Sequence, residues 1–316
     1  MKTAMLASMI GASVGASGWA AELKMGLASP AYHSGIGYII KTVVEANFPS
    51  TVEMLPGSVN AIYKAMDVGE INIYPVTWLP NNQGVYDEYV ARKGTVTCSD
   101  AGWTVSQGFM TTAAAQEKYG IRSISDLLRP EVALLTDTGH MGKGEIWVGE
   151  PQWQSTAIDK LRAKGYGFAD LYELQTYGEA VAEANLSAAL STGDVVILAG
   201  DDMMAALFPK GSVGFLSEPK HDPDKWHPVQ PTESPDWFDK GYVATSWPVA
   251  TSYICYNSAL RQVDPAVAEF IDRIRIPTDD VKDIVYSISV LKQEPEVVAR
   301  DWIQKNPDKV KEWLGR

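Results

Sequence analysis

The sequence predicts an α/β fold in two lobes. Segments with strand and helix patterns alternate over residues 23–76, and a second alternating set runs over residues 105–199. This alternation is typical of parallel sheets whose strands are joined by helical crossovers. At 316 residues the chain is long enough to form two domains of ordinary size.

The first alternating set contains three strands and two helices. Ser34 is expected to cap the first helix and Pro49 to end it, because serine favours the N-cap and proline cannot continue a helix. Gly69 is expected to end the second helix. The predicted elements are strands at residues 23–28, 51–55 and 71–76, and helices at residues 34–48 and 61–66.

Trp78 comes directly after the third predicted strand. Thr77 and Trp78 end the apolar run, and Pro80 and Asn82 then turn the chain. In sheets of this kind, ligands bind at the carboxyl ends of the strands. We therefore expect Trp78 to contact a ligand. A neighbouring element that covers the ring is the alternative.

The middle of the chain repeats the alternation. Ser123 and Asp126 have the spacing of a capping box, and Trp103 is expected in a loop that contains glycine. The predicted helices are residues 86–91, 113–119, 155–164 and 180–190, and the predicted strands are residues 95–98, 105–111, 132–135 and 195–199.

A Gly-rich segment, residues 137–153, precedes the helix at Ser155. It lacks the spacing and the Ser/Thr residue of a P-loop. His140 and Met141 stand where a calcium loop needs Asp or Asn, and His140 has no evident catalytic partner. The segment does place Trp153 at a helix start, where free N–H groups can hold an anion or an oxygen atom.

Five consecutive apolar residues at 195–199 indicate a strand that is buried on both faces. Asp201 and Asp202 follow at its carboxyl end. Two interpretations of these carboxylates stay open. They can cap the next helix, or one of them can face a cationic ligand in a cleft.

The segment over residues 217–241 is a long loop with five prolines, and loops of this length are often functional. Asp222, Asp224 and Glu233 could hold a hard cation such as Ca²⁺, or they could be solvated surface charges. No other cofactor is expected.

The chain then returns as an extended segment, residues 243–256, which contains Trp247. Predicted helices follow at residues 264–274, 278–291 and 295–314. Crossings near Ser106 and Tyr242 would place residues 21–105 and 243–316 in lobe I and residues 106–242 in lobe II.

The charge and the N-terminus restrict the class of protein. A net charge of −12 argues against nucleic-acid binding, because Lys and Arg are too few to neutralise phosphates. Lys2, the apolar run that follows it, and the small residues Gly18 and Ala20 predict a signal peptide at residues 1–20. We therefore expect a periplasmic protein.

The chain has two cysteines, Cys98 and Cys255. In an oxidising compartment they can form one disulfide, and two buried thiols are the alternative. Neither cysteine has the spacing of a structural zinc site.

The chain resembles the substrate-binding proteins of glycine betaine/proline-type ABC importers, the OpuAC/ProX group. The resemblance covers nearly the whole chain after residue 20 and implies a type II periplasmic binding fold. In this fold two lobes are joined by a two-stranded hinge and enclose the ligand. The segments that carry the resemblance are residues 69–71, 78–80, 123–127, 142–145, 151–153 and 298–303.

The resemblance also implies an aromatic box for a trimethylammonium group. Such a group cannot donate a hydrogen bond and is recognised by its charge against ring faces. Matching positions give Trp78 and Trp153 as two walls, whereas the third falls near Gly200. Trp147 is the first candidate to replace it, and Trp103 and Trp247 are the others.

Two further positions bear on the other end of the ligand. Some family members place a histidine on the carboxylate of betaine where this chain has Asn82, and Glu150 replaces an uncharged residue. These differences favour a ligand without a full carboxylate, such as trimethylamine N-oxide or choline. Glu150 would then share a proton with the N-oxide oxygen. Glycine betaine stays open, with the backbone N–H groups of Gln154 and Ser155 taking its carboxylate.

We therefore expect a periplasmic solute receptor, not an enzyme, that presents a small methylated ammonium compound to a membrane ABC permease. A secreted α/β hydrolase is the alternative, but the sequence has no G-x-S-x-G elbow. A sensory receptor could use the same fold.

Overall fold

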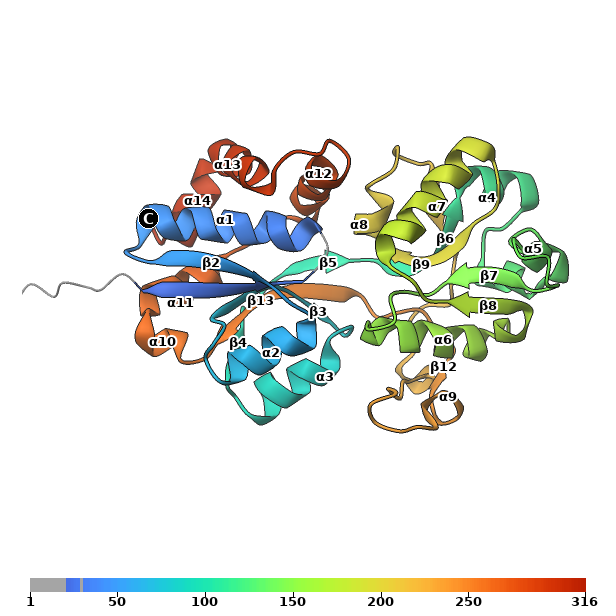
Figure 1. Cartoon of the computed structure of the whole chain (residues 1–316), viewed down its shortest axis with the longest axis horizontal. Coiled ribbons are helices and arrows are strands. Elements are labelled where there is room, and N and C mark those ends of the chain that lie inside the picture. The colour runs from blue at the N-terminus through green and yellow to red at the C-terminus, as the bar shows by residue number, and fades with distance from the viewer. Residues whose placement is uncertain (1–20, 29–30) are drawn as a thin grey trace, which may run out of the picture.

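The computed structural model describes residues 21–28 and 31–316, and it shows two lobes, each built on its own sheet (Figure 1). The predicted signal peptide lies outside the described residues. Within those residues, no helix combines the length and the apolar character that a membrane span requires.

The sheet of lobe I has the strand order β2-β1-β3-β13-β4, and β5 also pairs with β13. The first three strands in sequence are parallel, as predicted, whereas β13 runs antiparallel to its neighbours. Lobe I therefore combines the N-terminal part of the chain with a strand that returns late. The strands are β1 (Glu22–Leu27), β2 (Thr51–Pro56), β3 (Ile73–Leu79), β4 (Val96–Cys98), β5 (Trp103–Val105) and β13 (Ala250–Asn257).

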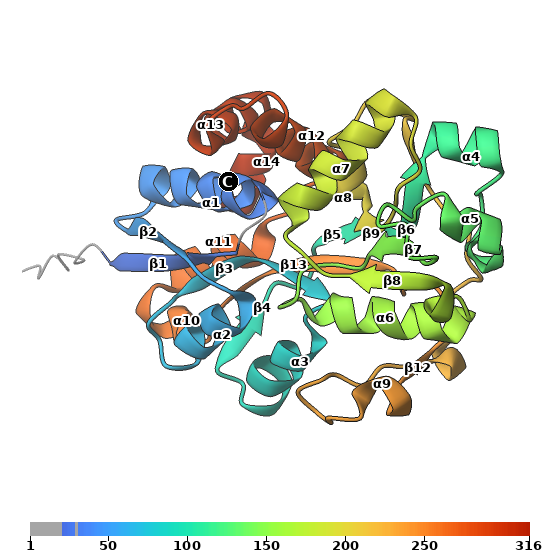
Figure 2. The same ribbon diagram turned by 45° about the vertical axis from the view of Figure 1, so that its right-hand side comes forward.

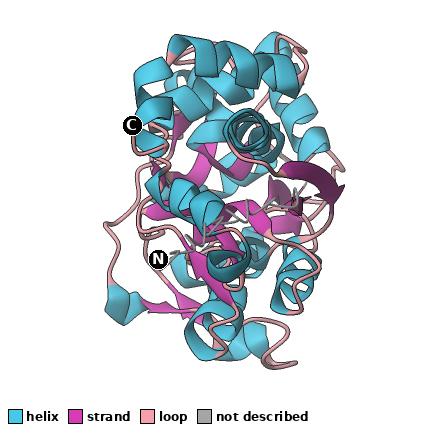
Figure 3. Ribbon diagram, turned by 90° about the vertical axis from the view of Figure 1, so that its left-hand side faces the viewer, coloured by secondary structure: helices cyan, strands magenta, loops and turns pink. Residues whose placement is uncertain are grey.

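Helices cover both faces of this sheet (Figure 3). One apolar core lies between the sheet and the helices α1 and α11 to α14, and a second lies under α2. The helices are α1 (Ala31–Asn47), α2 (Val59–Asp67), α3 (Gln83–Val85), a π-helix (Tyr86–Arg92), α10 (Leu260–Val263), α11 (Pro265–Arg273), α12 (Thr278–Ser289), α13 (Pro295–Lys305) and α14 (Pro307–Trp313).

The sheet of lobe II has the order β10-β6-β9-β7-β8. Its two edge strands, β8 and β10, are short and were not predicted, because a short edge strand carries little periodicity. The strands are β6 (Gln107–Thr112), β7 (Gly144–Trp147), β8 (Tyr172–Gln175), β9 (Ile197–Asp201) and β10 (Val213–Phe215).

The helices of lobe II pack on both sides of this sheet, and residues 217–243 form an excursion beside α6 that carries a two-stranded ribbon (Figure 1). The helices are α4 (Ala113–Tyr119), α5 (Pro130–Leu134), α6 (Gln154–Tyr166), α7 (Glu179–Thr192), α8 (Asp202–Ala205) and α9 (Trp237–Lys240), with 3-10 turns at Ile124–Leu128, Ala169–Leu171 and Pro223–Lys225. The ribbon consists of β11 (Trp226–His227) and β12 (Tyr242–Val243).

The chain passes between the lobes twice. Ser106 separates β5 of lobe I from β6 of lobe II, and the return lies between Trp247 and the start of β13 at Ala250. The lobes also meet where α8 lies beside α12 (Figure 2), and there Lys282 Nζ lies 3.3 Å from Asp202 Oδ2.

Several predicted elements were wrong. The predicted strand at residues 132–135 falls on the end of helix α5 and its C-cap Leu135, because Pro130 opens a helical turn and a short apolar run does not separate the two states. Trp103 lies in strand β5 instead of a loop. The last predicted helix breaks at Asn306, where Pro307 opens a new helix. Helix α1 begins at Ala31, so Ser34 lies inside it and does not cap it.

Cys98 and Cys255 form a disulfide. They face each other on the antiparallel strands β4 and β13, with their Cα atoms 3.9 Å apart. The bridge joins two positions that are 157 residues apart in the sequence, so it ties the returning strand to the N-terminal part of lobe I.

Candidate ligand-binding site

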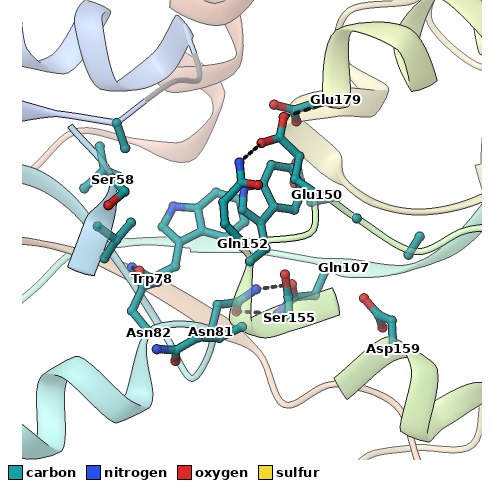
Figure 4. A pocket seen from close by; sticks show the side chains of 18 of the residues that line it. Ser58, Trp78, Asn81, Asn82, Gln107, Glu150, Gln152, Ser155, Asp159 and Glu179 are labelled. Atoms are coloured by element: carbon teal, nitrogen blue, oxygen red, sulfur yellow. Dashed lines mark hydrogen bonds between the residues drawn. The ribbon is translucent and has the colours of Figure 1, made fainter. Parts of the chain in front are cut away.

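A cavity of about 430 Å³ lies between the two lobes (Figure 4). From lobe I, it is lined by the end of β3 and the start of α2. From lobe II, it is lined by the turn before α6, the start of α7 and the end of β9. Gln107 and Trp247, which stand beside the two crossings, also line it. The cavity therefore lies at strand ends, where α/β sheets bind ligands.

Trp78 lines the cavity from lobe I. Strand β3 extends to Leu79, so Trp78 lies within the strand and not after it. The Asn82 side chain accepts a hydrogen bond from the Trp78 backbone N–H at 3.0 Å, and the Asn82 N–H donates to the Trp78 carbonyl at 2.7 Å. These bonds fix the turn that follows the strand, and Asn82 itself lines the cavity.

Trp153 lines the cavity from lobe II, at the N-cap of α6. Gly149 makes the preceding turn possible, because its φ of 121° suits glycine and a Cβ there would lie 2.3 Å from Thr156 Oγ1. Ser155, in the first turn of α6, also lines the cavity. The first N–H groups of a helix have no partner within the helix, so α6 presents donors at this wall.

Of the three candidates for a third aromatic wall, Trp247 lines the cavity. Trp147 lies behind Trp153, with ring centroids 5.8 Å apart and a T-shaped contact. The Trp147 indole N–H donates to the Tyr177 carbonyl at 2.8 Å, so Trp147 supports the wall from behind. Trp103 is buried in lobe I and does not line the cavity.

Carboxylates dominate the charged groups of the cavity. Glu150, Glu179, Asp201 and Asp159 line it, and none of the described residues that line it is Lys or Arg. His33 also lines it, but burial lowers the pKa of its imidazole to about 3, so the ring is neutral. The site therefore suits a cation.

Three of these carboxylates lie close together. Glu150 Oε1 accepts a hydrogen bond from the Glu179 backbone N–H at 2.9 Å, and Gln152 Nε2 donates to Glu150 Oε2. Asp201 Oδ1 accepts from the N–H groups of Met203 and Met204. Burial raises the pKa of Asp201 to about 6. Burial, with Asp201 and Glu150 nearby, raises the pKa of Glu179 well above its ordinary value.

Asp201 and Asp202, the two aspartates at the end of β9, therefore have different roles. Asp201 caps α8 and also lines the cavity, so both interpretations apply to it. Asp202 does not line the cavity and instead forms the ion pair with Lys282.

Glu179, Asp159 and Gln107 also line the cavity but were not predicted from the sequence. Asp159 lies four residues after Ser155 on α6, a spacing that puts both on one helix face, so it could have been found once Ser155 was a candidate. Gln107 exchanges two hydrogen bonds of 2.9 Å with Asn81. No local signal indicates Glu179, which reaches the site through the packing of α7.

The acidic residues of the 217–241 loop have local partners. Asp222 Oδ1 accepts from the Asp224 N–H at 3.1 Å, and Glu233 Oε2 accepts from the Gln230 N–H at 3.3 Å. Within residues 21–28 and 31–316, no three His, Cys, Asp or Glu side chains form a group that could hold a metal ion. Asp222, Asp224 and Glu233 therefore do not form such a group.

Comparisons with known proteins agree with this architecture. The model of the family described as the substrate binding domain of ABC-type glycine betaine transport system matches residues 21–305. The chain is 23% identical over 246 residues to the glycine betaine/proline betaine-binding periplasmic protein of Salmonella typhimurium, covering 74% of this chain and 69% of that one. It is 23% identical over 265 residues to the glycine betaine-binding periplasmic protein OusX of Dickeya dadantii, covering 81% and 77%.

Solved structures share the fold. Lactococcal OpuAC, in its closed conformation with glycine betaine, superposes with a TM-score of 0.71 at 15% identity, covering 93% of this chain and 99% of that one. A choline-binding protein of an ABC transporter, complexed with choline, gives a TM-score of 0.69 at 18% identity, covering 93% and 91%. The predicted two-lobed fold is therefore confirmed.

Proposed function

The chain belongs to the family of substrate-binding domains of ABC-type glycine betaine transport systems, and from this premise we propose that it captures a small methylated ammonium compound between its lobes. The family and the curated relatives are solute-binding proteins, not enzymes, which argues against the hydrolase alternative. Both curated relatives are periplasmic proteins, and we place this protein in the periplasm, where it would deliver its ligand to an ABC permease.

The composition of the cavity carries the proposal. Within the part of the chain that the structure describes, Trp78, Trp153 and Trp247 line it together with four carboxylates and no Lys or Arg. Ring faces attract a quaternary ammonium group by about 0.5–2 kcal/mol per contact. Carboxylates in a poorly solvated site add to the attraction. The same carboxylates repel an anionic group on the ligand.

The ligand class that fits is a methylated ammonium compound without a carboxylate. Trimethylamine N-oxide and choline meet this condition, and glycine betaine does not. The raised pKa values of Glu179 and Asp201 allow this acidic group to carry a proton. A protonated carboxyl group can donate a hydrogen bond to the oxygen of an N-oxide, which can only accept. The N–H groups at the start of α6 offer a second set of donors to that oxygen.

The two crossings suit a closing motion. Single connections at Ser106 and after Trp247 join the lobes, and hinges of this kind absorb the backbone change when two domains close on a ligand. Trp78 comes from lobe I and Trp153 from lobe II, so a ligand held between both rings would stabilise the closed form.

Calorimetric titration of the chain without residues 1–20 tests the proposal, with trimethylamine N-oxide, choline and glycine betaine as ligands. We expect trimethylamine N-oxide or choline to bind more tightly than glycine betaine and to change the tryptophan fluorescence. The proposal is wrong if none of the three binds, or if glycine betaine binds most tightly.

A further inference from the structure

Arg162 is a fully buried cation within lobe II, on helix α6. Its guanidinium lies 2.6 Å from Asp159 Oδ1 and also forms an ion pair with Glu218, whose side chain is 6% exposed. The Tyr166 hydroxyl donates to Glu218 Oε2 at 2.7 Å. An isolated buried charge costs several kcal/mol, so the two carboxylates are needed to hold Arg162 in place.

Asp159 connects this buried group to the cavity. Its Oδ1 atom accepts a second hydrogen bond, from the indole N–H of Trp247, at 2.9 Å. Both Asp159 and Trp247 line the cavity. The Arg162 guanidinium lies 5.9 Å from the Trp247 ring. One oxygen atom therefore joins a buried ion pair to an aromatic wall of the candidate site.

The chain around Trp247 is fastened to lobe II up to the crossing. Thr245 Oγ1 donates a hydrogen bond to the Lys220 carbonyl at 2.9 Å, and His221 Nδ1 forms a hydrogen bond with the Ser246 carbonyl at 2.9 Å. The Trp226 ring packs edge-on against Trp247, with centroids 4.9 Å apart. Two residues after Trp247, Val249 is 74% exposed. Trp247 is thus the last residue of this segment that lobe II holds firmly.

We propose that Asp159 is a positioning residue that fixes the Trp247 indole as a wall of the cation site and makes its ring face more attractive to a permanent positive charge. This deepens the proposed function and rests on it. An indole N–H that donates to a carboxylate forms a charge-assisted hydrogen bond, which polarises the ring toward greater negative charge on its face. The attraction of a ring face for a cation depends on that charge.

Asp159 should also favour a charged ligand over a neutral one. A neutral ligand of the same shape uses the same walls but gains nothing from the charge on the ring face. Asp159 should therefore raise affinity for choline over its neutral tert-butyl analogue, in which carbon replaces the ammonium nitrogen. A role for Asp159 in packing alone would affect both ligands equally, and a direct effect of its charge on the ligand is separated by testing Asp159→Asn in the Trp247→Phe background.

The test measures the binding of both ligands to the wild-type chain and to Asp159→Asn by calorimetry, after wild-type binding of choline has been established. We expect Asp159→Asn to weaken choline binding roughly tenfold, as for the loss of a charged hydrogen-bond partner, and to change binding of the analogue by less than about twofold. The ratio of the two affinities is the decisive quantity. Equal weakening of both ligands, or no weakening of choline, overturns the inference.

Trp247→Phe keeps a ring but removes the indole N–H, and it leaves the Asp159–Arg162 ion pair intact. It therefore tests the same hydrogen bond even if Asp159→Asn does not fold. We expect it to lower the same ratio, and Asp159→Asn to add little to it in the Trp247→Phe background. If Asp159→Asn has its full effect on the ratio in that background, the carboxylate acts directly on the ligand and the positioning role is wrong.

Trp237→Phe is the matched control. Trp237 lies on α9 and does not line the cavity, so the ratio should stay at its wild-type value, and a fall equal to that of Trp247→Phe would count against the inference. Failure of the wild-type chain to bind choline, trimethylamine N-oxide or glycine betaine would instead reject the proposed function itself.

Discussion

Replacing Trp153 with alanine should weaken ligand binding while the fold is largely kept. Trp153 lines the cavity at the N-cap of α6 and is only partly buried. Trp78, by contrast, is 7% exposed and belongs to the core of lobe I. Trp153→Ala therefore separates binding from stability better than Trp78→Ala.

The expected size follows from the single ring face that is lost. Trp147 packs against Trp153 in a T-shaped contact, and we take one face of the Trp153 ring to contact the ligand. One cation–ring contact contributes about 0.5–2 kcal/mol, which corresponds to a loss of roughly twofold to thirtyfold in affinity. The free energy of unfolding should fall by less than the roughly 3–5 kcal/mol that a buried Trp→Ala change costs.

Calorimetry with choline and trimethylamine N-oxide measures the loss of affinity, and denaturant unfolding without ligand measures stability. Trp237→Ala is the control, because Trp237 lies on α9 and does not line the cavity. Unchanged affinity in Trp153→Ala, with ligand binding intact in the wild type, would show that the ring is not a wall of the site and would refute the reasoning.

Three further predictions concern charge, closure and the disulfide. Choline affinity should rise between about pH 5 and pH 7, because Asp201, whose pKa is raised to about 6 by burial, is protonated below this range and ionised above it. The change is about tenfold for each unit by which the bound cation lowers that pKa. Asp201→Asn should reduce this pH dependence, and an unchanged slope would contradict the role of Asp201. Lys282→Met should weaken choline binding by up to about fivefold, because it removes the ion pair with Asp202 between the lobes. The loss should be larger at low salt. Equal choline affinities of the wild type and the variant at every salt concentration would show that the pair does not affect closure. Reduction of the Cys98–Cys255 disulfide, or replacement of both cysteines by serine, should lower the free energy of unfolding by roughly 2–5 kcal/mol, because the disulfide closes a long loop. Unfolding curves that coincide with and without reductant would refute this.

The sequence was informative where local patterns decide structure. The alternation of the first three strands, the capping box at Ser123 and the turn after Trp78 depend on neighbours in the chain, and each is present. Long-range pairing was not predictable. The antiparallel return of β13 beside β3, and the disulfide it allows, depend on the whole sheet.

The candidate site likewise combines residues that local patterns indicate with residues that only long-range packing places there. Trp78 and Trp153 follow signals that can be read locally, namely a strand end and a helix start. Glu179 and Asp159 reach the cavity only through the packing of α7 and α6. Trp147 illustrates the difficulty. Trp153, on the other side of the Gly149 turn, lines the cavity, whereas Trp147 is buried and its indole N–H donates a hydrogen bond to the Tyr177 carbonyl.

The missing aromatic residue at position 200 has a steric explanation. A Cβ on Gly200 would lie 2.3 Å from the Met110 methyl group and 3.1 Å from its sulfur. Met110 itself is fully buried in the core beside Trp147. A side chain at position 200 would therefore require the end of the Met110 side chain to move within that core, which disfavours an aromatic wall at the strand end of β9. Another element can supply a third ring, and Trp247 lines the cavity beside the return crossing. Because Trp247 donates a hydrogen bond to Asp159, a wall formed by Trp247 in place of position 200 would also bring a buried carboxylate next to the ligand. The aromatic substitution and the acidic character of the cavity would then have one structural origin, and both favour a cation that carries no carboxylate.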